Sequence, residues 1–184
     1  ADPDLVILDL DPDPDQGLEV VRAAARAVRA ACDELGLASF VQTSGSKGYH
    51  VVMPLVPGPD VEVVRDFAAE LAALVAARDP GRFTVEWRKE KRHGRLLLDT
   101  ARNGYAQTIV APYSVRPRPE APVATPIDWD ELGRVEPRSY TMANLRRRLA
   151  RKPDPWAGMA GQAVAFDPVR ARLDELLAEV RRRS

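Results

Sequence analysis

The stretch "VILDLDPDPD", residues 6–15, is an apolar run that carries Asp9 and Asp11 near its end and is closed by prolines. Successive side chains of a strand point to opposite faces, so both carboxylates share one face and the leucines share the other. Proline cannot donate to a strand ladder, and Pro12 therefore ends the predicted strand. Two carboxylates this close raise each other's pKa. Such a pair is tolerated when it is solvated or when a cation lies between its members.

Apolar periodicity predicts the elements that follow this strand. Apolar residues recur at spacings of three and four over 18–35 and again over 61–74, which indicates two amphipathic helices. Further strands are predicted at 38–43, 49–55, 95–99 and 107–115. The order β-α-β-β-α-β predicts an α+β fold with a ferredoxin-like (RRM-like) split βαβ core. In that core the sheet order is 4-1-3-2, and both helices cover one face.

This topology predicts where the polar residues meet. The first strand is central and ends at Asp9 and Asp11, while the neighbouring fourth strand carries Asp99. The third strand begins beside His50, and the turn "SGSKG" (44–48) joins the second and third strands at the same end. We therefore expect these features to converge on the open face of the sheet.

The chain changes character after the first 118 residues. "RPRPEAPVATP" (116–126) is rich in proline and predicts an extended strap. A basic helix is predicted at 141–152 and an amphipathic helix at 167–183. We expect residues 1–118 to form a catalytic lobe, and residues 119–184 to form the strap and C-terminal helices packed on it.

Charge is segregated along the chain, although the formal net charge is zero. Residues 1–35 hold nine acids against three arginines, whereas residues 82–118 hold nine Lys or Arg against three acids. This pattern suits a protein that holds cations at one place and phosphates at another. The single cysteine fits a reducing compartment, and no apolar run approaches the roughly 18 residues of a membrane span. These features predict a cytoplasmic protein without a membrane partner.

The Asp-x-Asp pattern leaves more than one chemistry open. Haloacid-dehalogenase phosphatases also open with an apolar run and Asp-x-Asp, but they usually carry Thr or Val where this chain has Asp13. Glycosyltransferases share the pattern as well. A further interpretation is a carboxylate cage for two Mg²⁺ or Mn²⁺ ions, since hard cations prefer oxygen ligands. Two ions about 3.5–4 Å apart can clamp the attacking and leaving oxygens of a phosphoryl displacement.

The turn "TSGSKGYH" (43–50) favours phosphate chemistry. Its glycines let the backbone approach a ligand, its serines offer hydroxyls, and Lys47 offers a positive charge. The Gly-x₄-Gly-Lys spacing of a P-loop is absent. A flexible hairpin turn is the alternative interpretation, but the position of His50 at the mouth of the central strands favours a functional one.

Five segments in this order, "LDLDP", "TSGSKGYH", "RKEKRHGRLLLDTARN", "QTIVAPYSVR" and "PVATPIDWDEL", resemble the polymerase domain of bacterial ligase D. That family belongs to the archaeo-eukaryotic primase superfamily and serves non-homologous end joining. The resemblance runs from about residue 4 to residue 132. It implies that Asp9, Asp11 and Asp99 hold two divalent cations, Mn²⁺ or Mg²⁺. It implies that the nucleotide is met by Ser44, Lys47, His50, Arg92, Arg102 and Arg116, with Lys89 as a further candidate.

The resemblance also implies a function: metal-dependent addition of ribo- or deoxynucleotides to DNA 3′ ends. The implied partners are DNA ends, NTP or dNTP, a ligase domain and the bacterial Ku protein, at a nucleoid-associated location. The N-terminal lobe of the family, which supplies nucleotide contacts and a pocket for a 5′-phosphate, does not precede Asp9 here. The chain is therefore expected to be a fragment. Two alternatives remain: a non-catalytic DNA-end or partner-binding module, disfavoured because buried unpaired acids are costly, and a metal-dependent phosphohydrolase.

Overall fold

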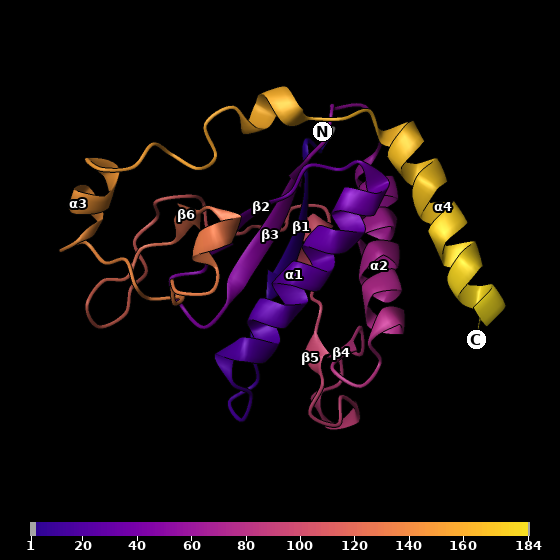
Figure 1. Ribbon diagram of the computed structural model, residues 1–184, viewed down its shortest axis with the longest axis horizontal. Coiled ribbons are helices and arrows are strands. Elements are labelled where there is room, and N and C mark those ends of the chain that lie inside the picture. Colours follow the sequence, from indigo (N-terminus) through magenta and orange to yellow (C-terminus); the bar gives the residue numbers. More distant parts are fainter. Residues whose placement is uncertain (1–2, 184) are drawn as a thin grey trace.

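The computed structural model describes residues 3–183, and its centre is a four-stranded antiparallel sheet (Figure 1). The strands are β1 (Leu5–Leu10), β2 (Phe40–Thr43), β3 (Tyr49–Pro54) and β6 (Thr125–Ile127), in the order β1-β3-β2-β6. On the free side of β1, Asp9 and Asp99 exchange two backbone hydrogen bonds of 2.8 and 3.2 Å. The sheet thus agrees with the predicted order, with β6 added at the far edge.

Helices α1 (Leu18–Leu35) and α2 (Val61–Arg78) lie side by side over one face of this sheet (Figure 1). The leucine face of β1 packs beneath them, and Leu8, Val41 and Val51 are completely buried there. Gly36 ends α1 in the left-handed region, with φ of 67°, as a C-terminal glycine allows. The α+β class with a split βαβ core is confirmed, and α1 and α2 leave the opposite face of the sheet uncovered (Figure 1).

The predicted strand at 95–99 is divided between two partners. Leu96–Leu97 forms β5 and pairs in parallel with β4 (Phe83–Thr84), because the amides of Leu96 and Leu98 donate to the carbonyls of Arg82 and Thr84. Asp99 alone turns to β1. This division still places Asp99 beside Asp9.

The predicted strand at 107–115 is wrong. The segment is irregular: it forms an isolated bridge between Val115 and Val123, the Tyr113 amide donates to the Ala124 carbonyl, and the Ala124 amide donates to the Ser114 carbonyl. Pro112 lacks an amide donor, and Tyr113 has a positive φ of 63°, which breaks an extended ladder. The segment instead runs as a loop along the open face, where the Val110 carbonyl accepts a hydrogen bond from Gln42.

The predicted helix at 141–152 is also wrong in extent, because α3 covers only Leu145–Leu149. Like charges four residues apart, such as Arg147 and Arg151, disfavour a longer helix. The C-terminal helix α4 (Phe166–Arg183) agrees with the prediction and packs against α2, at the opposite end of the molecule from α3 (Figure 1). The division at residue 118 stays a prediction. Among the helices formed by residues 3–183, none combines the length and apolar content needed to cross a membrane.

Candidate active site

A row of polar side chains crosses the open face of the sheet. Strand register places Asp9 opposite His50, and His50 opposite Gln42. Asp99 stands opposite Asp9 on the other side. Paired residues of neighbouring strands project to the same face. The fold therefore aligns these four side chains on the face that α1 and α2 leave open.

The Asp9 carboxylate is an uncompensated charge in this row. Its side chain is 14% exposed, and among the described residues its buried Oδ1 has no hydrogen-bond partner. His50 Nε2 lies 3.4 Å from Oδ1, and Arg102 Nε lies 3.8 Å from Oδ2. Burial, followed by the charge of Asp99, raises the pKa of Asp9 to about 6 in spite of the nearby arginines. A cation is the group that would compensate such an oxygen.

Asp11 and Asp99 lie beside Asp9, and we call these three carboxylates the acidic wall. Desolvation, followed by the charge of Asp9, raises the pKa of Asp11. The Asp11 side chain lies over Gly48, where a Cβ would come within 2.7 Å of Asp11 Oδ1 and 1.8 Å of the Leu10 carbonyl. Asp99 Oδ1 accepts the Ala101 amide at 2.8 Å, which fixes its orientation. All three carboxylates line one cavity of about 270 Å³.

Gln42 fixes the tautomer of His50. The Gln42 Nε2 atom lies 3.1 Å from the Val110 carbonyl and 3.1 Å from His50 Nδ1. An amide nitrogen has two protons and no acceptor lone pair, so it donates to both, and Nδ1 accepts. The ring proton therefore sits on Nε2, which faces Asp9. Burial lowers the pKa of His50 to about 4, so the ring is neutral at neutral pH.

The turn 44–48 presents donors at the end of the acidic wall. Ser44 Oγ accepts the amides of Ser46 and Gly48, at 3.2 and 3.1 Å, which leaves its hydroxyl proton free to donate. Gly45 has a φ of 65°, and a Cβ there would lie 2.7 Å from Arg116 Cγ. The glycine thus admits Arg116 against the turn. Arg116 Nε is buried and has no hydrogen-bond partner within residues 3–183.

Two cavities meet at the acidic wall. The serine cavity, of about 490 Å³, is lined by Ser44, Ser46, Thr108, Ile109, Val110, His50, Arg116 and Arg118. The tryptophan cavity, of about 270 Å³, is lined by Pro12, Asp13, Lys47, Trp87, Arg92, Leu97 and Asp99. Both cavities also include Asp9, Asp11 and Arg102. The site is therefore a cleft whose two halves share two carboxylates and one arginine.

The nucleotide-binding residues implied by the resemblance divide between these halves. Ser44, His50 and Arg116 line the serine cavity, whereas Lys47 and Arg92 line the tryptophan cavity. Arg92 donates to the carbonyls of Glu86 and Trp87, at 3.0 and 2.9 Å. Its Nη1 and the Nζ of exposed Lys89 each lie 3.5 Å from Asp13 Oδ1. Arg92 thus links the segment that contains Glu86 and Trp87 to the loop that follows β1. The nucleotide-binding roles of the residues in both cavities stay predictions.

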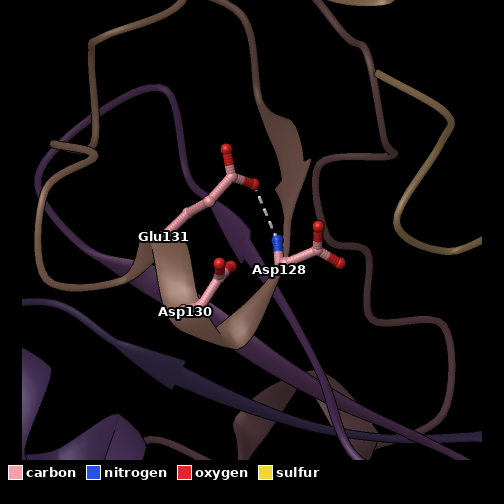
Figure 2. Close-up of side chains that lie close together, drawn as sticks. All are labelled: Asp128, Asp130 and Glu131. Atoms are coloured by element: carbon pink, nitrogen blue, oxygen red, sulfur yellow. Dashed lines mark hydrogen bonds between the residues drawn. The ribbon is translucent and has the colours of Figure 1, made fainter.

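A second acidic cluster lies at the far edge of the sheet (Figure 2). Ligand atoms of Asp128, Asp130 and Glu131 lie within 4.8 Å of one another, so their spacing could hold a metal ion. Asp9, Asp11 and Asp99 do not meet that spacing within the described residues. Glu131, however, accepts the Asp128 amide at 2.9 Å (Figure 2) and forms ion pairs with Arg148 and Lys152. Arg148 and Lys152 already neutralise this cluster. The acidic wall of Asp9, Asp11 and Asp99 is therefore the stronger candidate for a bound metal ion.

Sequence reasoning missed several residues of the cleft. Gln42 could have been found, because antiparallel pairing puts it on the face of His50. Arg118, which lines the serine cavity, lies two residues after Arg116 in a segment that the sequence predicts to be an extended strap. Nothing in the sequence distinguishes Trp87 from a core aromatic. The acidic residues at 128–131 lie in a segment that carries the family resemblance, but nothing in that segment marks them as a metal site.

The fold is shared with a solved polymerase domain. The "Polymerase Domain from Mycobacterium tuberculosis Ligase D in complex with DNA" superposes with a TM-score of 0.80 at 31% identity, over 89% of this chain and 57% of that chain. Residues 1–156 match the family described as "LigD, primase-polymerase domain", and the chain therefore belongs to that family. The predicted family is confirmed.

Curated relatives agree with this assignment. The multifunctional non-homologous end joining protein LigD of Pseudomonas aeruginosa is 36% identical over 162 residues, which cover 86% of this chain and 19% of that protein. The corresponding DNA repair protein of Mycobacterium tuberculosis is 35% identical over 153 residues, which cover 81% of this chain and 20% of that protein. The chain thus spans about a fifth of the length of these relatives.

Proposed function

We propose that this chain adds nucleotides to the 3′ ends of DNA during repair of double-strand breaks by non-homologous end joining. The observation that carries the proposal is the Asp9 carboxylate, which is buried, has no hydrogen-bond partner at Oδ1 among residues 3–183 and lines the same cavity as Asp11 and Asp99. Membership of the LigD primase-polymerase family and the end-joining names of the relatives support it.

Asp9, Asp11 and Asp99 would hold two divalent cations, Mn²⁺ or Mg²⁺. The fit follows from the donor set, since three carboxylates are hard oxygen ligands, and from the buried Asp9 Oδ1, which has no hydrogen-bond partner among residues 3–183. When bound, such ions stabilise the charge that develops on the attacking and leaving oxygens. Asp9 and Asp11 line both cavities, so ions that they would hold could be reached from either cavity.

The serine cavity fits the triphosphate of the incoming nucleotide. It offers the Ser44 hydroxyl, the His50 Nε2 proton and the guanidinium groups of Arg102 and Arg116 as donors to phosphate oxygens. In the reaction the 3′-hydroxyl oxygen bonds to the α-phosphorus. The bond from that phosphorus to the bridging oxygen breaks, pyrophosphate leaves and the hydroxyl proton passes to solvent. Lys47 and Arg92 approach from the tryptophan cavity.

The proposal includes the partners implied by the family. The solved Mycobacterium tuberculosis domain is described in complex with DNA, which supports DNA ends as the substrate. A ligase domain and the bacterial Ku protein are expected to act with this chain at breaks, in the cytoplasm beside the nucleoid. These partners and this location are proposed because the chain belongs to the LigD family, whose relatives are named for end joining, and no contact within residues 3–183 bears on them.

Primer extension tests the proposal. With Mn²⁺, one labelled NTP and a recessed duplex, we expect the chain to lengthen the primer by at least one nucleotide. Asp99→Ala should abolish the product, because it removes an oxygen ligand from the acidic wall, whereas Glu62→Ala on the exposed side of α2 should not. DNA binding without extension would support a non-catalytic module instead. Phosphate release from simple esters without DNA would support a phosphohydrolase.

Nucleotide binding should also be visible as thermal stabilisation. A ligand at about 100 times its Kd stabilises the folded state by about 2.7 kcal/mol, so NTP with Mn²⁺ should raise the Tm. Lys47→Ala and Arg116→Ala should each reduce this shift, because each removes a positive charge from the cleft. Arg65→Ala is the matched control, since Arg65 is exposed on α2 and, among residues 3–183, pairs with neighbouring Asp66 alone. A full shift in the Lys47/Arg116 double variant would contradict the assignment of these residues.

A further inference from the structure

Trp87 is a large apolar side chain left in the open beside the acidic wall. It is 60% exposed, and it lines the tryptophan cavity with Asp9, Asp11 and Asp99. The other two tryptophans are engaged, because their Nε1 atoms donate to the carbonyls of Ser39 and Val41. Indole rings bury a large area when they gain a partner, so an exposed indole on a cavity wall is suited to a flat aromatic ligand.

The backbone around Trp87 is held in place while its ring stays free. Arg92 donates to the carbonyls of Glu86 and Trp87, at 3.0 and 2.9 Å. The amide of Glu86 donates to Thr84 Oγ1, and its carboxylate accepts the Arg88 amide. Because the peptide is fixed by these bonds, the ring is presented to the cavity at a defined place, and little freedom remains to be lost when a ligand stacks on it.

The rest of the tryptophan cavity matches a nucleotide attached to a phosphate backbone. Lys47, Arg92 and Arg102 supply positive charge on the same walls, and bases stack on aromatic side chains whatever their sequence. Two ligands carry such a base: the incoming nucleotide and the strand that is extended. Most of the donors assigned to the triphosphate, namely Ser44, His50 and Arg116, line the serine cavity and not the tryptophan cavity, which Lys47 and Arg92 line. We therefore expect the incoming nucleotide to occupy mainly the serine cavity, which leaves Trp87 for the strand.

We propose that Trp87 stacks on the 3′-terminal base of the strand being extended and so positions its 3′ end against the acidic wall. The inference rests on the proposed function, because it needs the 3′ end as substrate. It adds a residue that neither the motifs nor the family resemblance singled out. Trp87 acts here as a binding residue and takes no part in bond making.

The test is a double-mutant cycle between the protein and the DNA. A 5′-labelled single-stranded oligonucleotide is compared, by fluorescence anisotropy at fixed salt, with the same strand lacking only its 3′-terminal base. Loss of one base–aromatic stack weakens binding by about five-fold to about 150-fold. We expect Trp87→Ala to weaken binding of the intact strand in that range and to leave binding of the abasic strand unchanged. Trp87→Phe should restore most of the affinity.

Tyr105→Ala is the matched control, because Tyr105 is 79% exposed but lines neither cavity. An equal loss in Tyr105→Ala, no loss in Trp87→Ala, or an equal loss with both strands would overturn the inference. A smaller NTP-dependent rise in Tm in Trp87→Ala, with strand binding unchanged, would overturn it in favour of the incoming base. Primer extension by the wild-type chain is scored separately. If the wild-type chain extends the primer but Trp87→Ala binds the intact strand normally, only the stacking role of Trp87 is rejected. If Trp87→Ala shows the expected loss but the wild-type chain does not extend the primer, the proposed nucleotide addition is rejected.

Discussion

Replacing Asp9 with asparagine should abolish nucleotide addition and, in buffer free of divalent cations, raise the stability of the fold. Loss of activity follows because the amide supplies no charge to bind a cation, and such ions contribute several kcal/mol to transition-state stabilisation. The expected loss is on the order of 10³-fold or more. The gain in stability follows because the ionised Asp9 is buried with an oxygen that makes no hydrogen bond within residues 3–183.

The pH dependence of the stability gained by Asp9→Asn identifies the ionised Asp9 carboxylate as its cause. Folding raises the pKa of Asp9 from 3.8 to about 6, so the folded state holds the proton more tightly than the unfolded chain does. The cost of ionised Asp9 therefore begins above pH 4 and is complete above about pH 6, where it corresponds to about 3 kcal/mol. Asp9→Asn should be more stable than wild type at pH 7.5, and the difference should shrink as the pH falls to 5.

In wild type, the contribution of His50 to stability changes with pH in the opposite direction to that of Asp9. Its pKa is lowered on folding to about 4, so it favours the folded state less as the pH falls from about 6.5 to 4. Comparing the two proteins at each pH separates the contribution of Asp9 from this background. Asp33→Asn on the exposed side of α1 is the control, and it should change neither stability nor activity appreciably. Equal stability of Asp9→Asn and wild type at pH 7.5 in EDTA would contradict the explanation.

Much of the site could be predicted from the sequence because it follows from strand alternation. Period-two alternation in "VILDLDPDPD" places Asp9 and Asp11 on one face, and the split βαβ topology brings His50 beside them. The position of Asp99 could be predicted from topology, although its strand contributes one bridge rather than a ladder.

The remainder depends on contacts between segments that carry no periodic signal. The loop at 107–115 has strand-like composition, but Pro112 and the positive φ of Tyr113 make it a cover for the serine cavity. The resemblance implies Arg92 as a cation near the nucleotide, but it does not predict that Arg92 also donates to the carbonyls of Glu86 and Trp87. A guanidinium group can donate either to backbone carbonyls or to phosphate oxygens, so the tertiary structure decides which of the two it contacts.

Replacing Arg148 with methionine should destabilise the fold by about 1–3 kcal/mol, because Glu131 loses one of its two cationic partners and keeps only Lys152. The side chains of Arg148 and Glu131 are 8% and 6% exposed. They meet through two hydrogen bonds of 2.8 and 2.9 Å, and Arg148 also donates to the Pro126 carbonyl of β6. The pair thus fastens α3 to the edge of the sheet. Chemical denaturation of the variant and wild type measures the loss.

A double variant separates this pair from a metal site at 128–131. Replacing both partners with apolar residues of similar size, as in Arg148→Met with Glu131→Leu, should recover much of the stability, because no buried charge is then left alone. Burial alone would raise the pKa of Glu131, but hydrogen bonds from Arg148, the Asp128 amide and Lys152 lower it to about 2. Wild type should therefore lose stability as the pH falls from about 4.5 towards 2, and Glu131→Gln should lack that component. Mn²⁺ binding distinguishes the two acidic sites. Because Arg148 and Lys152 already neutralise the cluster at 128–131, Glu131→Gln should leave the Mn²⁺-dependent rise in Tm intact, whereas Asp9→Asn should remove it. Loss of the rise in Glu131→Gln, with the rise kept in Asp9→Asn, would place the metal site at the far edge of the sheet.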